Sequence, residues 1–427
     1  MSIKARSIVY VRLKSLRMWK LLCIFLGVFQ ASSGERVRYD NYHAYEVKAE
    51  NMESLEFLRS LESSSERLLF LNNVQLIGQS AFVFVAPEKV SDFEDSLNKS
   101  NIPFELKSSN AQNIIQADED DLLKPRSAEY DWTEYHDLEE TYSWMESLAA
   151  KYPQVTVVEG GRTYEGQGNP GIVIEAGIHS REWIACTTAT FMINELLNSS
   201  TTSVREVAEN YDWYIFPHLN PDGFAYTRNL EIGDRMWRRT RSKQANGCIG
   251  VDANRNWDFH WREIGASGQP CLDDFAGPAP FSEIETKTFA DYIRSLKGQI
   301  RLYISLHSWS QLLMYPYGHT QRLPVNVEDY RQITNAAIQA MAKRYGTKYI
   351  GGNIYDAIYP ASGTSIDWVF GTQGVKLTFT YELRPSGHGA VTFSHDLPKE
   401  FIIPTAEETV DSIVALVNEA KKLKYFD

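Results

Sequence analysis

Short apolar runs and amphipathic stretches alternate along most of this chain. Between residues 43 and 107 they predict strands at 43–49, 68–71, 81–86 and 103–107, with helices at 52–62 and 90–99. These elements form a small α/β unit of about 70 residues, which is enough for an independent but marginal core.

A second pattern begins near residue 127. Four short apolar segments, at 171–177, 213–219, 300–306 and 375–381, read as strands. Amphipathic stretches at 142–152, 184–197, 283–296, 327–345 and 405–423 read as helices. Strands that alternate with helices predict an α/β domain with a mostly parallel or mixed sheet.

The acidic run Asp118–Asp121 and the following Lys124, Pro125 and Arg126 separate the two patterns. A charged segment that contains proline predicts an exposed linker. Its basic residues are candidate cleavage points for a trypsin-like protease, and an ordinary interdomain linker is the alternative.

The N-terminus has the pattern of a targeting segment. Basic residues precede the apolar run Leu21–Phe29, and small residues follow up to Gly34, which is typical of a secretory signal over residues 1–34. The apolar run is shorter than the about 20 residues that cross a bilayer, so we expect a secreted, extracellular protein without a membrane span. A signal anchor is the alternative interpretation of this segment, and Met18 is an alternative start.

Composition narrows the function classes. The net charge of −12, without a basic stripe, argues against a nucleic-acid partner. The 10 Trp, 23 Tyr and 20 Phe residues permit a large core and exclude global disorder. Four cysteines exclude a disulfide scaffold but leave room for one bridge, for which Cys248 and Cys271 are candidates, with Cys186 as a small buried residue.

Polar residues follow each of the four predicted strands. These segments are His179-Ser-Arg-Glu182, Asn220-Pro-Asp-Gly-Phe224, His307-Ser-Trp-Ser-Gln311 and Glu382-Leu-Arg384. Ligands bind outside the carboxyl ends of strands in open α/β sheets, so the four segments predict one converging site. Two imidazoles and a carboxylate with an open fourth position are typical of catalytic zinc.

The other histidines and the nearby arginines also bear on this zinc-site interpretation. A lone His-x-x-Glu is common by chance, and we interpret His218 and His260 as packing or surface residues and the remaining histidines as structural: His43, His136, His319, His388 and His395. Arginines cluster in the segments 235–241 and 252–257. Guanidinium groups bind carboxylates in a bidentate manner, which favours a substrate with a free carboxylate, and a solvated basic loop is the alternative.

At these residues the chain resembles the zinc metallocarboxypeptidases of the pancreatic A/B type. The motifs GIHSREW, NPDGF, WRRTRS, CIGVDANRNWD, LHSWSQLLMYPYG, IYPASGTSIDW and TYELR occur in order between about residues 130 and 385. The resemblance implies a mixed, eight-stranded type of sheet flanked by helices in a catalytic domain over 127–427. It also implies that residues 35–126 are an activation domain with its linker, with a ferredoxin-like α+β fold that shields the active site until it is removed.

The family's functional residues carry over onto matching positions. The resemblance implies one Zn²⁺ held by His179, Glu182 and His307, the ligand set known for carboxypeptidase A. Glu382 would be the general base and Arg238 would stabilise the oxyanion. The resemblance also implies that Asn254, Arg255 and Tyr359 bind the terminal carboxylate of the substrate and that Arg181 lines the neighbouring subsite. It further implies a disulfide between Cys248 and Cys271.

The specificity position matches Ile366. Ile354, Ile358, Ala361 and Thr380 would complete an apolar pocket. An enzyme for basic residues would need a carboxylate there, because an unpaired buried charge is costly. We therefore expect hydrolysis of C-terminal aromatic or aliphatic residues from peptides.

Three departures from the family pattern stand out. Only Gln167–Pro170 lies between Gly166 and Gly171, where the family carries another strand, so either the sheet is rearranged or the chain is a variant or a faulty gene model. Trp309 replaces a usual tyrosine. The segment Pro385–Phe393 diverges, so Phe393 has no assigned place in the cleft wall.

We expect a secreted, monomeric zymogen that a trypsin-like protease activates and that acts on the C-termini of peptides and proteins. Two alternatives remain. One is a catalytically dead binding protein that lacks a strand, and the other is a hydrolase with the same zinc set, such as an acyl-amino-acid deacylase.

Overall fold

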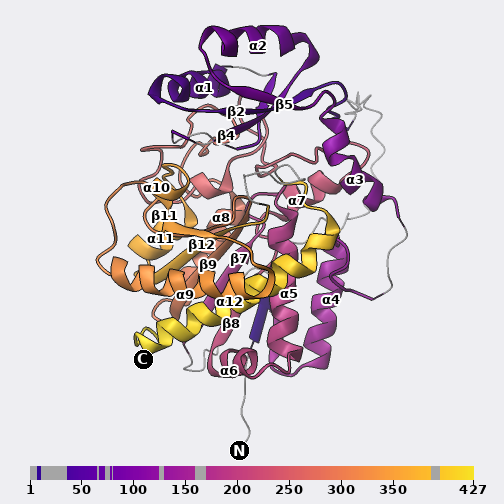
Figure 1. Cartoon of the computed structure of the whole chain (residues 1–427). Helices are drawn as coiled ribbons and strands as arrows, with labels where there is room; N and C mark the ends of the chain where they lie inside the picture. Colours follow the sequence, from indigo (N-terminus) through magenta and orange to yellow (C-terminus); the bar gives the residue numbers. More distant parts are fainter. Residues whose placement is uncertain are drawn as a thin grey trace, which may run out of the picture.

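A computed structural model describes residues 7–10, 36–64, 67–72, 77–78, 80–124, 129–158, 170–385 and 395–427. A small N-terminal domain, which begins at residue 36, lies over one end of a larger C-terminal domain, which begins at residue 129 (Figure 1). None of the helices in these ranges is both long and apolar enough to span a bilayer.

The N-terminal domain is a four-stranded antiparallel sheet with two helices. Its strand order is β3 (Leu68–Phe70), β4 (Ser80–Val85), β2 (His43–Lys48) and β5 (Phe104–Ser108). Helices α1 (Met52–Ser64) and α2 (Val90–Lys99) contribute Leu58 and Leu97 to a core that includes Val47 and Val83. The six elements predicted from the sequence are confirmed, because each amphipathic segment buries its apolar side in this core.

The expected exposed linker is wrong for its first part. Residues Gln112–Leu122 form helix α3, in which Asp118 and Glu119 are buried. Asp118 accepts a hydrogen bond from Arg235 and Glu119 pairs with Arg36. The acidic run is therefore part of a helix that packs against the rest of the protein. The local sequence did not indicate this, because the two arginines that pair with the run lie far away in the chain. Pro125 and Arg126 lie outside the described residues.

The C-terminal domain is built on an eight-stranded mixed sheet. Its strand order is β11 (Ile350–Asn353), β10 (Leu312–Tyr315), β12 (Leu377–Leu383), β9 (Ile300–Ser308), β7 (Gly171–Ala176), β8 (Asp212–Phe216), β1 (Ser7–Tyr10) and β6 (Val155–Val158). The pair β10–β12 is antiparallel and the other described pairs are parallel. The four predicted strands are confirmed as the adjacent strands β12, β9, β7 and β8.

Helices cover both faces of this sheet. Ile172 and Ile174 of β7 face a core shared with α4 (Leu138–Lys151), α5 (Trp183–Asn198), α9 (Val327–Tyr345) and α12 (Ile402–Lys422). Val173 faces the opposite core, shared with α8 (Ile284–Ser295) and α11 (Ser365–Gly371). Both faces of β7 are buried, which is why its sequence is a continuous apolar run. Shorter helices complete the domain: α6 (Thr202–Asn210), α7 (Pro221–Arg228), η2 (Ala253–Arg255), α10 (Ile354–Ala357) and η3 (Lys399–Phe401).

Strand β1 takes a position that the sequence did not predict. Ser7–Tyr10 pairs in parallel with β6 on one side and with β8 on the other. It is visible as a short indigo strand within the larger domain (Figure 1). The sheet is thus rearranged, with a segment from the start of the chain between β6 and β8. The signal segment over residues 1–34 remains a prediction, and most of it lies outside the described residues, as does 159–169.

The cysteines are placed as the sequence suggested. Cys248 and Cys271 form a disulfide with a Cα–Cα distance of 5.3 Å. Cys186 is a free, buried residue of α5. The disulfide ties together two loop segments that flank η2, where several candidate site residues lie.

Candidate active site

Two histidines and a glutamate converge at the carboxyl ends of β7 and β9. His179 lies in the turn after β7, Glu182 immediately precedes α5, and His307 is near the end of β9. Glu182 Oε1 lies 2.8 Å from His179 Nδ1, and Glu182 Oε2 lies 3.0 Å from His307 Nδ1. One ligand atom from each residue falls within 4.8 Å of the others, and all three side chains are buried. The three donors can therefore bind one ion.

The outer nitrogen of each histidine faces a polar side chain. Asp252 Oδ1 lies 3.2 Å from His179 Nε2, and Asn254 Nδ2 lies 3.4 Å from His307 Nε2. Asp252 can accept the Nε2–H of His179, and an acceptor of this kind fixes the orientation of a metal-binding imidazole, whereas the amide nitrogen of Asn254 is a donor and cannot do so for His307. The carboxylate of Asp252 is held in turn by its own bonds to Arg238 Nε and Nη2, at 3.0 and 2.8 Å. Sequence reasoning gave Asp252 no role, although it stands within the DANRN motif.

The pKa values of the two glutamates of the site are shifted in opposite directions. Burial disfavours the charge of Glu182, but His179 and His307 outweigh it and hold the pKa of Glu182 well below its ordinary value. Burial raises the pKa of Glu382 to about 8, and the charge of Glu182 adds to this effect. Glu382 lies on β12 directly opposite His307 of β9. One carboxylate is therefore suited to bind a cation and the other to exchange protons.

Arginines line the same cleft. Arg238 is buried against Asp252, and Arg255 of η2 is 1% exposed. Arg255 Nε and Nη1 donate to the carbonyls of Gly265 and Asn254, whereas Nη2 is buried and has no partner among the described residues. The guanidinium lies 5.6 Å from the ring centre of Tyr359. This arrangement leaves one donor of Arg255 available for an anion.

A buried apolar cluster adjoins the arginines. Ile366, at the start of α11, is 2% exposed and packs with other apolar residues, namely Leu312, Met314, Ile354 and Ile358. Ala361 and Thr380 are also buried. The predicted pocket residues are thus buried, and Tyr359, which packs against this cluster, lies 5.6 Å from the guanidinium of Arg255.

The N-terminal domain closes the cleft. Leu71 and Asn72 line a cavity of about 50 Å³ together with residues of the site that include Arg181, Glu182, Trp309 and Glu382. Phe82 packs edge-to-face on Trp309, at 5.2 Å between ring centres. A space of this size does not admit a peptide.

Most histidines read as structural stay outside the site. His218 packs on Phe224, His260 stacks on His319, and His136 stacks on Tyr130. His395 is different, because it lines the cleft cavity. Its sequence context gave no signal, because it follows the divergent segment 385–393, of which residues 386–394 lie outside the described residues together with His388 and Phe393.

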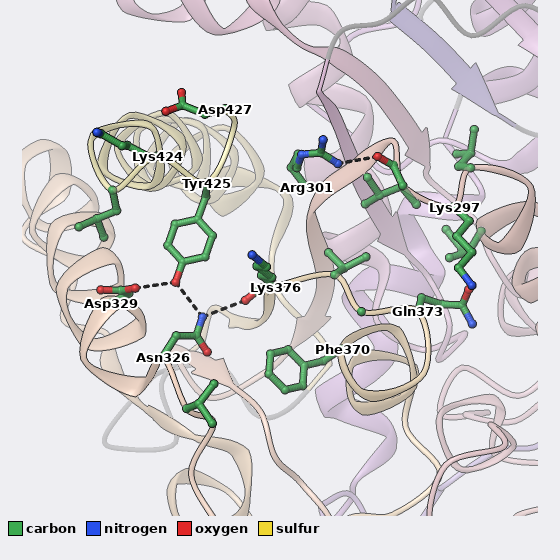
Figure 2. A pocket seen from close by; sticks show the side chains of 18 residues that line it. Lys297, Arg301, Asn326, Asp329, Phe370, Gln373, Lys376, Lys424, Tyr425 and Asp427 are labelled. Atoms are coloured by element: carbon green, nitrogen blue, oxygen red, sulfur yellow. Dashed lines mark hydrogen bonds between the residues drawn. The ribbon is translucent and has the colours of Figure 1, made fainter.

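A larger crevice lies at the opposite end of β9, near Ile300 and Arg301 (Figure 2). Its volume is about 660 Å³. Tyr425 donates to Asp329 at 2.6 Å, and Asn326 donates to Tyr425 and to the carbonyl of Lys376 (Figure 2). Several polar side chains of this crevice therefore bind one another, and its lining contains none of the candidate metal ligands.

The donor set fits zinc. Two imidazole nitrogens and a carboxylate, with an open position toward a cleft, are the ligands of a catalytic rather than a structural zinc site. Together with the nearby general-base candidate and the arginine-lined pocket, the fold and site define a zinc-dependent peptidase.

Comparison with known proteins gives the family. Residues 141–412 match the zinc carboxypeptidase family and residues 45–118 match the carboxypeptidase activation peptide. The chain is 49% identical to zinc carboxypeptidase A 1 of Drosophila melanogaster, over 97% of this chain and 100% of that protein. It is 34% identical to carboxypeptidase A2 of Mus musculus, over 85% of this chain and 90% of that protein. The crystal structure of carboxypeptidase A from Helicoverpa armigera superposes with a TM-score of 0.80 at 27% identity, over 90% of this chain and 98% of that chain.

The chain belongs to the zinc carboxypeptidase family and is a metallocarboxypeptidase with an activation peptide. The N-terminal domain corresponds to that peptide, so the closed cleft described above is the cleft of a zymogen.

Proposed function

We propose that this metallocarboxypeptidase is a secreted zymogen that, once activated, releases aromatic or aliphatic residues from the C-termini of peptides. The observation that carries the specificity is the buried Ile366 within an apolar cluster beside Arg255. An aliphatic pocket favours apolar side chains in proportion to the apolar area that they bury.

The substrate would be oriented by its terminal carboxylate. The unpartnered Nη2 of Arg255 supplies a donor for it, and Asn254 and Tyr359 lie beside this arginine. Burial strengthens the pairing because little water competes for the charged groups. A peptide held in this way presents its last peptide bond to His179, Glu182 and His307.

His179, Glu182 and His307 would hold Zn²⁺, which would polarise the scissile carbonyl and lower the pKa of water. Glu382 would take the proton of the attacking water and later deliver it to the leaving amine. Its raised pKa suits the transfer of this proton to the leaving amine, because a carboxyl group with a raised pKa stays protonated until that transfer. Arg238, fixed by two hydrogen bonds to Asp252, would stabilise the developing oxyanion.

Secretion is supported by the N-terminal pattern of charge and hydrophobicity and by the disulfide, since disulfides persist in oxidising compartments. Expression of the full chain in a secreting host, followed by N-terminal sequencing of the protein in the medium, tests it. Retention of the protein inside the cells would contradict secretion.

Specificity is tested with trypsin-treated protein and three blocked peptides that end in Phe, Leu or Lys. We expect release of free Phe and Leu that a chelator abolishes and added zinc restores. Faster release of Lys would overturn the proposed preference. Untreated protein is the control, and it should be nearly inactive because the N-terminal domain closes the cleft.

A further inference from the structure

His395 is a buried histidine of the cleft without a hydrogen-bond partner. It is 6% exposed, and neither ring nitrogen has a partner within the described part of the chain. It shares the cleft cavity with Arg181, Glu182, Arg238 and Glu382. A buried imidazole that leaves both nitrogens unpaired costs free energy, unless a ligand or water pairs with them.

Arg181 lines the same cavity and is also incompletely paired. Its Nη2 donates to the carbonyl of Leu71 at 3.2 Å, and this carbonyl belongs to the activation peptide. Its Nη1 makes long contacts of 3.3 and 3.4 Å to the carbonyl of Met236 and to the part-exposed Asp273. Its Nε is buried and has no partner among the residues that the structure describes. Removal of the activation peptide therefore frees a second donor on this guanidinium.

Arg235 holds Arg181 and His395 together. Its Nη1 donates to the carbonyl of Arg181 at 2.9 Å, and its Nη2 donates to the carbonyl of His395 at 2.7 Å. The guanidinium also stacks on Trp183, 3.7 Å from the ring centre. These contacts lie within the C-terminal domain, whereas the bond from Arg235 Nε to Asp118 is lost when the activation peptide leaves. The two side chains are thus part of one preformed surface.

The charge around this surface favours an anion. Burial lowers the pKa of His395 well below its ordinary value, and Arg181, Arg235 and Arg238 act in the same direction. The imidazole is therefore neutral and carries one N–H donor. The carboxyl groups that face this surface are Glu182, which is the candidate metal ligand, Glu382, which lines the same cavity, Asp252, which is paired with Arg238, and Asp273, which is 38% exposed. A carboxylate that accepts from both His395 and Arg181 would satisfy donors that are otherwise unpaired.

The position of the surface tells which part of a substrate it meets. The last residue of a peptide would occupy the closed pocket near Ile366 and Arg255. The rest of the peptide must leave through the mouth of the cleft, which in the zymogen is covered by Leu71 and Asn72. Arg181 contacts Leu71 directly, so it lies at this mouth.

We propose that Arg181 and His395 form a specificity subsite that binds an acidic side chain of the peptide upstream of the scissile bond. This inference rests on the proposed function. The activated enzyme thus prefers C-terminal apolar residues that follow a glutamate or aspartate. In the zymogen the carbonyl of Leu71 accepts the Arg181 hydrogen bond that the acidic side chain would accept in the activated enzyme.

The test compares activated wild-type enzyme and variants on blocked tripeptides that end in Phe. Glu, Gln or Leu is placed at either of the two preceding positions, and Ala-Ala-Phe is the reference. At one of these positions we expect kcat/KM for Glu to exceed that for Gln about tenfold, the effect of one hydrogen bond to a charged group. His395→Phe should reduce this ratio to within about threefold, whereas His395→Gln, which keeps an N–H donor, should retain part of it.

Ala-Ala-Phe shows whether each variant is folded and competent, because this peptide does not use the subsite. An equal Glu-to-Gln ratio in wild type and His395→Phe, or no preference for Glu in wild type, would overturn the subsite. Failure of the proposed function is a different result, in which wild type prefers Ala-Ala-Lys to Ala-Ala-Phe. The Glu and Gln comparison would then be made on peptides that end in Lys, and it would decide the subsite in the same way.

Discussion

Asp118 and Arg235 form a buried ion pair across the boundary between the activation peptide and the C-terminal domain. Asp118 Oδ2 lies 2.6 Å from Arg235 Nε, and the two side chains are 7% and 1% exposed. Breaking a buried pair by removing one partner leaves the other charge uncompensated, at a cost of about 3–5 kcal/mol. This pair therefore links α3 to the wall of the cleft.

Asp118→Asn should weaken the hold of the activation peptide after the chain is cut. We expect the cut peptide to dissociate about a hundredfold more readily than in wild type, the lower end of the cost of an unpaired buried charge. Size-exclusion chromatography and inhibition of the cut protein measure this. Asp95→Asn, at an exposed position of α2, is the matched control. Equal retention of the peptide in Asp118→Asn and wild type would show that the pair contributes nothing.

Stability of the zymogen should fall as the pH rises above the ordinary carboxyl range. Burial raises the pKa of Asp396 well above its ordinary value, and the neighbouring Asp118 adds to this effect. Burial raises the pKa of Glu62, which faces Asp273 and Asp274 across the same boundary, to about 8. The folded state holds protons that the unfolded chain releases, so the free energy of unfolding decreases between about pH 4 and the folded-state pKa values.

Differential scanning calorimetry between pH 5 and pH 8 measures this decrease as a falling Tm. Asp396→Asn cannot lose a proton and can still donate to Asp118, so its Tm should fall less steeply over this range. A slope identical to that of wild type would assign the pH dependence to other groups.

Asp252→Asn should weaken metal binding. Asp252 contacts His179 Nε2 and holds Arg238, so its loss leaves the imidazole less firmly oriented. Partners of this kind contribute about 10- to 100-fold to metal affinity. Competition for zinc with a chromophoric chelator gives the affinity directly. Asp258→Asn, in the same stretch but exposed, should bind zinc like wild type.

Ile366→Asp should shift the preference of the pocket toward basic residues. A buried carboxylate without a partner is unfavourable, so we expect kcat/KM for a C-terminal Phe peptide to fall about a hundredfold and the protein to lose about 2–4 kcal/mol of stability. A C-terminal Lys or Arg supplies the missing charge and should be released faster than by wild type. Ile366→Leu, which keeps volume and polarity, is the control. Unchanged hydrolysis of Phe peptides would place Ile366 outside the pocket.

Local patterns predicted the larger elements well, and contacts between distant segments explain what was missed. Helix α9 begins and ends at the predicted residues, because its apolar face is regular and Gly346 follows it with positive φ. The second half of α3, from Asp118, was predicted to be an exposed linker, and this was wrong because Asp118 and Glu119 are paired with Arg235 and Arg36. The convergence of His179, Glu182 and His307 followed from strand ends in a parallel sheet.

The parts of the cleft that depend on three-dimensional neighbours were not predictable in this way. Asp252 gains its importance from a histidine 73 residues away. His395 reaches the cleft through a bond from Arg235, 160 residues earlier in the chain. Neither distance leaves a periodic or compositional trace in the sequence.

Strand β1 makes two interpretations of the N-terminus compete for the same residues. Ser7–Tyr10 is hydrogen-bonded to β6 and β8, yet the predicted secretory signal would remove everything before residue 35. A protein matured at that site would keep six hydrogen-bonded strands of this sheet, because Val155–Val158 is paired only with β1 among the described residues, and the edge of Asp212–Phe216 would be exposed. Unpaired edges of this kind invite another strand. Residues 7–10 can therefore either be removed with a secretory signal or remain as a strand of the sheet, but not both. The mass of the mature chain shows which of the two occurs.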